Sequence, residues 1–149
     1  KDQAGRESPP PGGSETAMCR LCPPRLAFVL RNPLRRWLTD FDAIFREAGI
    51  GPDSRVLEVG AGNGFFTGPL VRAAREVVAV EVQPEMVRLL ERNLERDGVD
   101  RSRLRVEAGD VSSIDLEPAS IDVAFLYFSC HEIAAPATAA RRLAAVVRP

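Results

Sequence analysis

The stretch that decides the fold is Val56-Leu57-Glu58-Val59-Gly60-Ala61-Gly62-Asn63-Gly64-Phe65-Phe66-Thr67 (VLEVGAGNGFFT). It is an apolar run that stops at a carboxylate and then at three alternate glycines. A buried strand that ends in glycines and continues into a helix usually forms the binding turn for a nucleotide-like ligand. The sequence therefore predicts a strand, a glycine turn and a helix, with the ligand at the turn.

The segments on either side of this turn alternate between strand and helix patterns. Strands are expected at residues 55–59, 77–82, 104–106 and 121–128, and helices at residues 33–38, 41–48, 65–75, 84–96 and 136–147. Buried-looking strands that alternate with helices are typical of a parallel sheet covered by helices on both faces. We therefore expect an α/β, Rossmann-like fold.

Three parts of the chain differ in composition. Residues 1–17 are rich in proline, glycine and charge and contain no aliphatic residue larger than alanine, so we expect a disordered leader there. Residues 18–50 are expected to form an N-terminal helical arm, and residues 51–149 a Rossmann-like domain. The pattern contains four strands and then stops at Arg148-Pro149, which favours a domain truncated after its fourth strand.

Charge and cysteine content narrow the class of partner. The chain has 20 Lys and Arg against 21 Asp and Glu, so its net charge of −1 makes nucleic acid an unlikely partner in general. The basic residues are unevenly distributed. The stretch from residue 20 to residue 39 contains no acidic residue and five arginines, namely Arg20, Arg25, Arg31, Arg35 and Arg36. No apolar run approaches the roughly 20 residues of a membrane helix, so no membrane partner is expected. Three cysteines make no disulfide framework, which favours a reducing, cytoplasmic setting.

Three kinds of site compete for the glycine turn. A phosphate-binding P-loop requires a lysine after its last glycine, and none follows Gly64. A dinucleotide fingerprint requires a third glycine at position 65, where this chain has Phe65. Glu58, two residues before Gly60, would repel a pyrophosphate but suits a cationic ligand. The arrangement Glu-x-Gly-x-Gly-x-Gly is the pattern of S-adenosylmethionine sites, in which the glycines let the backbone approach the ligand closely.

Two further acids follow the next two expected strands. Glu81 lies near the end of the second strand, where a carboxylate can accept hydrogen bonds from both ribose hydroxyls. Asp110 follows the third strand and can accept from the adenine amino group, with Val111 against the ring; alternatively it forms an Asx-turn toward Ser112. The predicted cofactor-binding residues are therefore Glu58, Gly60, Ala61, Gly62, Gly64, Glu81, Val82, Asp110 and Val111.

These motifs together resemble a known family. Residues 55–132 are similar to the class I S-adenosylmethionine-dependent methyltransferases, and this resemblance implies strand order 3-2-1-4 with the cofactor over the carboxyl ends of strands one and four. Cys22-Pro23, the Asn-Pro-Leu-Arg-Arg motif at 32–36 and His131-Glu132 resemble a small prokaryotic branch near the ubiquinone/menaquinone and arsenite methyltransferases. The function expected is methyl transfer from S-adenosylmethionine to a small-molecule acceptor.

The residues after strand four leave alternatives open. His131, the only histidine, either caps the following helix with Glu132 or lines the acceptor pocket as the catalytic group that orients or deprotonates the nucleophile. Cys19-x-x-Cys22 lacks a second pair to complete a zinc site, so no metal is expected. Two other functions remain, a non-catalytic cofactor-binding module and an NAD-binding half-domain. An exposed strand four would also favour self-association.

Overall fold

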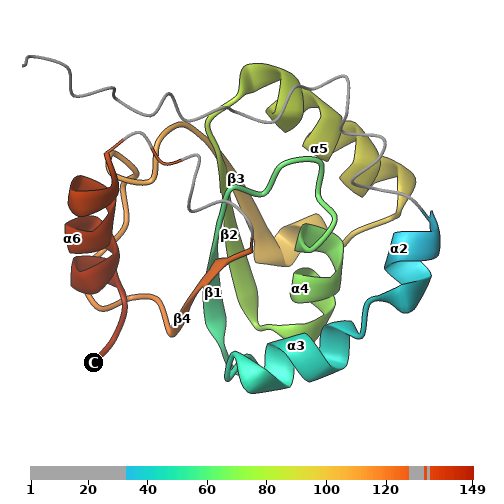
Figure 1. The fold of residues 1–149 in the computed structure, drawn as a ribbon, viewed down its shortest axis with the longest axis horizontal. Helices are drawn as coiled ribbons and strands as arrows, with labels where there is room; N and C mark the ends of the chain where they lie inside the picture. Colours follow the sequence, from blue (N-terminus) through green and yellow to red (C-terminus); the bar gives the residue numbers. More distant parts are fainter. Residues whose placement is uncertain (1–32, 128–132, 134) are drawn as a thin grey trace, which may run out of the picture.

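The computed structural model describes residues 33–127, 133 and 135–149. Its centre is a parallel sheet of four strands in the order β3-β2-β1-β4 (Figure 1). The strands are β1 (Arg55–Val59), β2 (Glu76–Glu81), β3 (Leu104–Ala108) and β4 (Val123–Leu126). The predicted order 3-2-1-4 is confirmed.

Helices cover both faces of this sheet. The chain forms α2 (Pro33–Leu38), α3 (Phe41–Glu47), α4 (Thr67–Ala73), α5 (Pro84–Arg96), the 3₁₀ turn η2 (Arg101–Arg103) and α6 (Pro136–Val146). In Figure 1, α6 lies on one side of the sheet, and α3, α4 and α5 lie on the other. The predicted α/β, Rossmann-like fold is therefore confirmed.

The alternation of side chains along β1 supplies both cores. Val56 packs with Phe45 and Leu70 on the α3–α4 face, whereas Leu57, its neighbour, packs with Ile121 and Val146 on the α6 face. Successive strand residues point to opposite faces, so a run of apolar residues is what a strand covered on both sides requires.

Two elements are several residues shorter than predicted. The expected helix at 65–75 begins only at Thr67, because Phe65 and Phe66 turn into the core as the glycine turn ends. It ends at Ala73, since Ala74 already has extended backbone and leads into β2. The expected strand at 121–128 is regular only over Val123–Leu126, and Ile121 instead forms an isolated parallel bridge with Val147.

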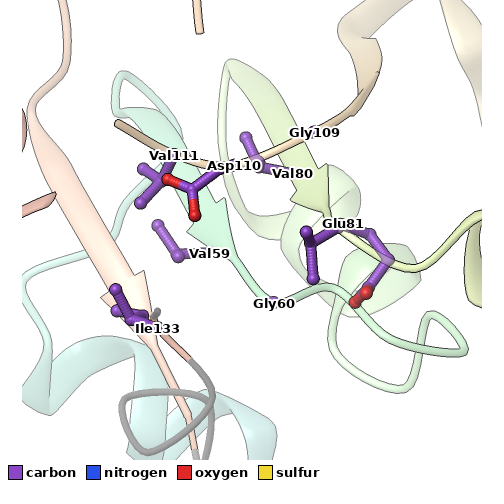
Figure 2. Close-up of a pocket in the computed structure, with 9 residues that line it drawn as sticks. Val59, Gly60, Val80, Glu81, Gly109, Asp110, Val111 and Ile133 are labelled. Atoms are coloured by element: carbon purple, nitrogen blue, oxygen red, sulfur yellow. The ribbon is translucent and has the colours of Figure 1, made fainter. Parts of the chain in front are cut away.

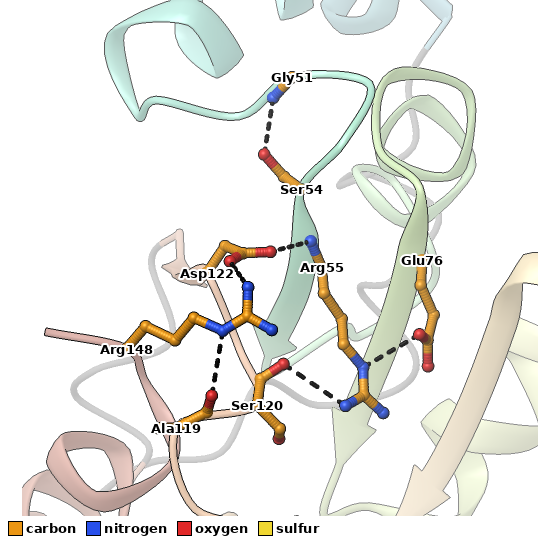
Figure 3. A network of polar contacts seen from close by, with 8 residues as sticks. All are labelled: Gly51, Ser54, Arg55, Glu76, Ala119, Ser120, Asp122 and Arg148. Carbon is orange, nitrogen blue, oxygen red and sulfur yellow. Dashed lines mark hydrogen bonds and ion pairs between the residues drawn. The ribbon is translucent and has the colours of Figure 1, made fainter.

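A polar network joins the start of β1 to the start of β4 and to the chain after α6 (Figure 3). Asp122 accepts a hydrogen bond from the backbone N–H of Arg55 at 2.7 Å and one from Arg148 at 2.6 Å. Arg148 also donates to the carbonyl of Ala119 at 3.0 Å, and the Arg55 side chain lies 3.0 Å from Glu76. These contacts hold the amino ends of the strands, away from the edge where the glycine turn lies.

Several predictions fall on residues outside the described ranges. They concern the leader at 1–17, the Cys19-x-x-Cys22 pair, and the Cys130-His131-Glu132 segment after β4. Within the described ranges, no helix is long and apolar enough to cross a bilayer.

Candidate ligand site at the carboxyl edge of the sheet

A cavity lies where β1, β2 and β3 end, at the edge where open α/β sheets bind ligands (Figure 2). The cavity is open to solvent, and its empty volume, with that open space included, is about 370 Å³. Its lining residues are Val59, Gly60, Val80, Glu81, Val82, Gly109, Asp110, Val111 and Ile133. Five predicted residues are thus brought together, namely Gly60, Glu81, Val82, Asp110 and Val111.

Glu81 ends β2 and is held in position by two backbone N–H groups. Its side chain is only 3% exposed. One carboxylate oxygen accepts from Gly62 at 2.8 Å, and the other accepts from Gln83 at 2.9 Å. Each carboxylate oxygen has a second lone pair, so both can still accept a hydrogen bond from a ligand hydroxyl. The acid therefore joins the glycine turn to the end of β2 while it lines the cavity.

The glycine turn needs its glycines for two different reasons. Gly62 has φ +56°, in the left-handed region, and this places its N–H toward Glu81. Gly64 has φ +85° and lies against α5, where an added Cβ would stand 2.7 Å from a methyl carbon of Leu90. Neither Gly62 nor Gly64 lines the cavity, nor does Ala61. These three residues shape the turn that presents Gly60 to it.

Asp110 lines the cavity and also forms the Asx-turn that was the alternative expected from sequence. Its Oδ1 accepts from the backbone N–H of Ser112 at 2.7 Å and from the Ser112 hydroxyl. Val111, beside it, is 3% exposed and packs in the core on the α6 face. The turn orients the carboxyl group, and Val111 supplies an apolar wall.

Glu58 does not line this cavity. It is 4% exposed, and its Oε2 accepts a hydrogen bond from the Thr67 hydroxyl at 2.7 Å. The pKa of Glu58 is raised to about 8, mainly by burial and to a smaller extent by the nearby Glu81. The hydrogen bond from Thr67 acts in the opposite direction and lowers it. At neutral pH the buried carboxyl is therefore largely protonated.

Sequence reasoning missed several residues that build the site. Val59, Val80, Gly109 and Ile133 line the cavity, and the first two could have been found as the last apolar residues before Gly60 and Glu81. Asn93 is 8% exposed and donates to the carbonyl of Asn63 at 2.8 Å, which ties the glycine turn to α5. Asn93 could have been found from the sequence, because it is a lone polar residue on the apolar face of that helix.

The comparisons with known proteins agree with this geometry. Residues 57–149 match the family described as methyltransferase domain. The chain belongs to the methyltransferase domain family. A SAM-dependent methyltransferase from Aquifex aeolicus has a similar structure, with a TM-score of 0.77 and 27% identity over 87% of this chain and 69% of that one. The predicted class, a class I S-adenosylmethionine-dependent methyltransferase domain, is thereby confirmed.

Curated relatives of this methyltransferase domain include enzymes named for ribosomal RNA. A ribosomal RNA small subunit methyltransferase of Arabidopsis thaliana is 36% identical over 74% of this chain and 29% of its own length. Ribosomal RNA small subunit methyltransferase A of Thermosynechococcus vestitus is 37% identical over 50% of this chain and 26% of its own length. The chain thus spans less than a third of the length of either relative.

Proposed function

We propose that this chain binds S-adenosylmethionine in the cavity at the carboxyl edge and transfers its methyl group to a small-molecule acceptor. The observation that carries the proposal is Glu81, a buried carboxylate held by two backbone N–H groups at the mouth of that cavity. The ribose hydroxyls would donate to Glu81, and the adenine amino group to Asp110. When bound, the cofactor would supply a methyl group bonded to a positively charged sulfur, and the neutral thioether S-adenosylhomocysteine would be the leaving group.

The residues present fit this cofactor. Carboxylates accept from hydroxyl and amino groups, Val59, Val80 and Val111 offer apolar surface to a ring, and Gly60 lets the backbone come close. The protein then mainly positions the acceptor and excludes water. The predicted contact of Glu58 with the methionine end would run through water, because Glu58 is buried and does not line the cavity.

The acceptor class rests on charge. The chain's net charge is −1, whereas nucleic acid binding relies on basic residues. A small molecule therefore fits better. The names of the curated relatives favour ribosomal RNA as the second candidate.

Titration calorimetry tests the cofactor site. S-adenosylhomocysteine should bind, and NADH should not. Glu81→Ala should weaken the binding of S-adenosylhomocysteine by about 1–3 kcal/mol, because ligand hydroxyls lose a buried acceptor. The wild-type chain should also prefer adenosine to 2′-deoxyadenosine, and this preference should vanish in Glu81→Ala.

A control separates contact from turn geometry. Asn93→Ala removes the hydrogen bond from α5 to the glycine turn and leaves Glu81 in place. It should therefore weaken the binding of adenosine and of 2′-deoxyadenosine equally and keep the preference for ribose. Tighter binding of NADH than of S-adenosylhomocysteine, or an unchanged ribose preference in Glu81→Ala, would overturn the assignment.

His131, outside the described residues, is proposed as the catalytic group that orients or deprotonates the acceptor. A methyl-transfer assay with labelled S-adenosylmethionine, offering small-molecule extracts and total RNA separately, would identify the acceptor class. His131→Ala should then lower kcat while the affinity for S-adenosylhomocysteine stays unchanged. Label found only in RNA would contradict the small-molecule proposal.

A further inference from the structure

Glu58 is a buried carboxyl group that has no cationic partner. It lies within the apolar strand β1, where it is 4% exposed, and it accepts one hydrogen bond, from the Thr67 hydroxyl at 2.7 Å. Within the described part of the chain, no Lys or Arg charge acts on it. Buried charges in proteins are normally paired, because an unpaired charge loses its hydration and gains nothing in return. An acid in this position therefore stays neutral until a positive charge comes near it.

The groups around Glu58 supply no such charge. Ala79 of β2 and Phe125 of β4 lie beside Glu58 in the sheet, and Glu81, two residues after Ala79, has its side chain on the same face. Glu81 is an acid, so its charge makes the ionisation of Glu58 harder. The helices that cover this face are α3, α4 and α5, and their exposed charged residues are Asp42, Arg46, Glu47, Arg72, Glu85, Arg88, Arg92, Glu95 and Arg96. The remaining charged residue of these helices, Glu91, forms an ion pair with Arg101 at 2.6 Å.

The cavity lies close enough for the charge of a ligand to reach Glu58. Gly60, which lines the cavity, is two residues further along, and a strand rises about 3.3 Å per residue, so the two backbones are about 7 Å apart. Glu81, the acid that acts on Glu58, also lines the cavity, as Figure 2 shows. The effective dielectric constant inside a protein is well below that of water, so a unit charge at this range changes the protonation of a buried acid.

We propose that Glu58 makes the site selective for a cationic ligand, because it releases its proton to solvent when S-adenosylmethionine binds. The carboxyl group takes a proton back from solvent once the neutral thioether S-adenosylhomocysteine is left in the site. Glu58 thus stabilises the charged cofactor more than the product without touching either of them. This inference rests on the proposed function, since it requires the cofactor to occupy the cavity at the carboxyl edge.

Titration calorimetry counts the released proton without any measurement of activity. Each ligand is titrated at pH 7 in phosphate and in Tris, because these buffers differ in their heat of protonation and the difference gives the number of protons released. The pKa of Glu58 is about 8, so most free chains hold the proton at pH 7. S-adenosylmethionine should therefore release roughly half a proton or more in excess of S-adenosylhomocysteine. At about pH 9.5, where Glu58 is already ionised, this excess should vanish.

Matched variants assign the proton to Glu58. Glu58→Gln keeps an oxygen that accepts from the Thr67 hydroxyl, but it cannot ionise. It should lose the excess proton release, and its preference for S-adenosylmethionine over S-adenosylhomocysteine should fall at least roughly fivefold at pH 7. Glu95→Gln, which removes an exposed carboxyl group from α5, should match the wild type in both measurements.

A second variant keeps the acid and removes its hydrogen bond. The Thr67 bond lowers the pKa of Glu58, so Thr67→Val should make ionisation harder and should weaken S-adenosylmethionine more than S-adenosylhomocysteine. Equal proton release by the two ligands in the wild type, or an unchanged preference in Glu58→Gln, would overturn the inference and leave the proposed function standing. A wild-type chain that binds neither ligand would contradict the proposed function itself.

Discussion

Two carboxyl groups on neighbouring strands, Glu58 and Glu81, lie in different environments although both are buried. Glu81 receives two backbone N–H groups at the cavity, whereas Glu58 receives one hydroxyl, from Thr67, behind it. Burial favours the neutral form of Glu58. The two acids thus differ in environment, and only Glu81 lies where the proposed ligand hydroxyls would reach it.

Glu58 should make stability depend on pH. Its pKa in the folded chain is about 8, above the ordinary value of 4.5, so the folded state holds the proton more tightly than the unfolded state. Its stabilising contribution is therefore full below pH 4.5 and is lost as the pH rises to about 8. Urea unfolding at pH 5.5 and pH 8 should show a decrease on the order of a few kcal/mol. Glu58→Gln should remove most of this decrease, and an equal decrease in that variant would contradict the assignment.

Gly64 should tolerate substitution less well than a comparable glycine elsewhere. Gly64 and Gly98 both have positive φ, +85° and +61°, but only Gly64 faces a close neighbour, Leu90. Gly98→Ala should cost only the backbone strain, about 1–2 kcal/mol. Gly64→Ala should cost about 1–3 kcal/mol more, because the methyl group overlaps Leu90. Chemical denaturation measures both, and equal losses would show that α5 yields to the added methyl.

At the scale of elements, the short helix α4 and the short strand β4 owe their bounds to neighbours in space. Phe66 lies 5.3 Å, centre to centre, from Phe125 of β4, and both belong to the core that Phe45 of α3 completes. Phe66 is thus buried in this cluster immediately before α4 begins at Thr67. Helical propensity is a weak preference that such packing overrides.

The join between β1, β4 and the end of α6 depends on Asp122. The backbone N–H of Arg55 lowers the pKa of Asp122 below its ordinary 3.8, and Arg148 lowers it further. The stabilising contribution of the Asp122 carboxylate is therefore present above pH 3.8. It is lost as the pH falls through the lower pKa that Asp122 has in the folded chain. Asp122→Ala should cost about 1–3 kcal/mol at pH 7, since the Arg55 N–H loses its acceptor.

The exposed Asp115 supplies the control for this network. Asp115→Ala should leave the free energy of unfolding within about 0.5 kcal/mol of the wild type. Urea unfolding compares the two variants with the wild type at pH 7 and in acid, where the cost of Asp122→Ala should shrink. A cost that is the same at both pH values would show that the ionised carboxyl group is not what joins the strands.

At the scale of the whole fold, β4 is an edge strand of the sheet that the described residues form. Within the described part of the chain, β4 pairs with β1 on one side, and the Ile121–Val147 bridge is the only pairing seen on the other. An open strand edge can pair with another chain. We therefore expect self-association that increases with protein concentration, measured by analytical ultracentrifugation.

A charge on the edge strand should suppress this association. Ala124, half-buried in β4, is replaced in Ala124→Lys, and Ala140→Lys on the exposed part of α6 is the control. Only the first variant should shift the protein toward monomer. A wild-type chain that stays monomeric at all concentrations would contradict the prediction.

The sequence by itself determined the four strands, their order through the family resemblance, the glycine turn, and the placement of Glu81 and Asp110 at the carboxyl edge of the sheet. These features follow from local patterns, because side-chain period and the left-handed turn are properties of adjacent residues. Only the tertiary structure decided that Glu58 is buried against Thr67, that Asn93 secures the turn, and that α2 turns its leucines and Trp37 outward. The environment of a side chain depends on residues distant in the chain, and no local pattern records which of them will pack against it.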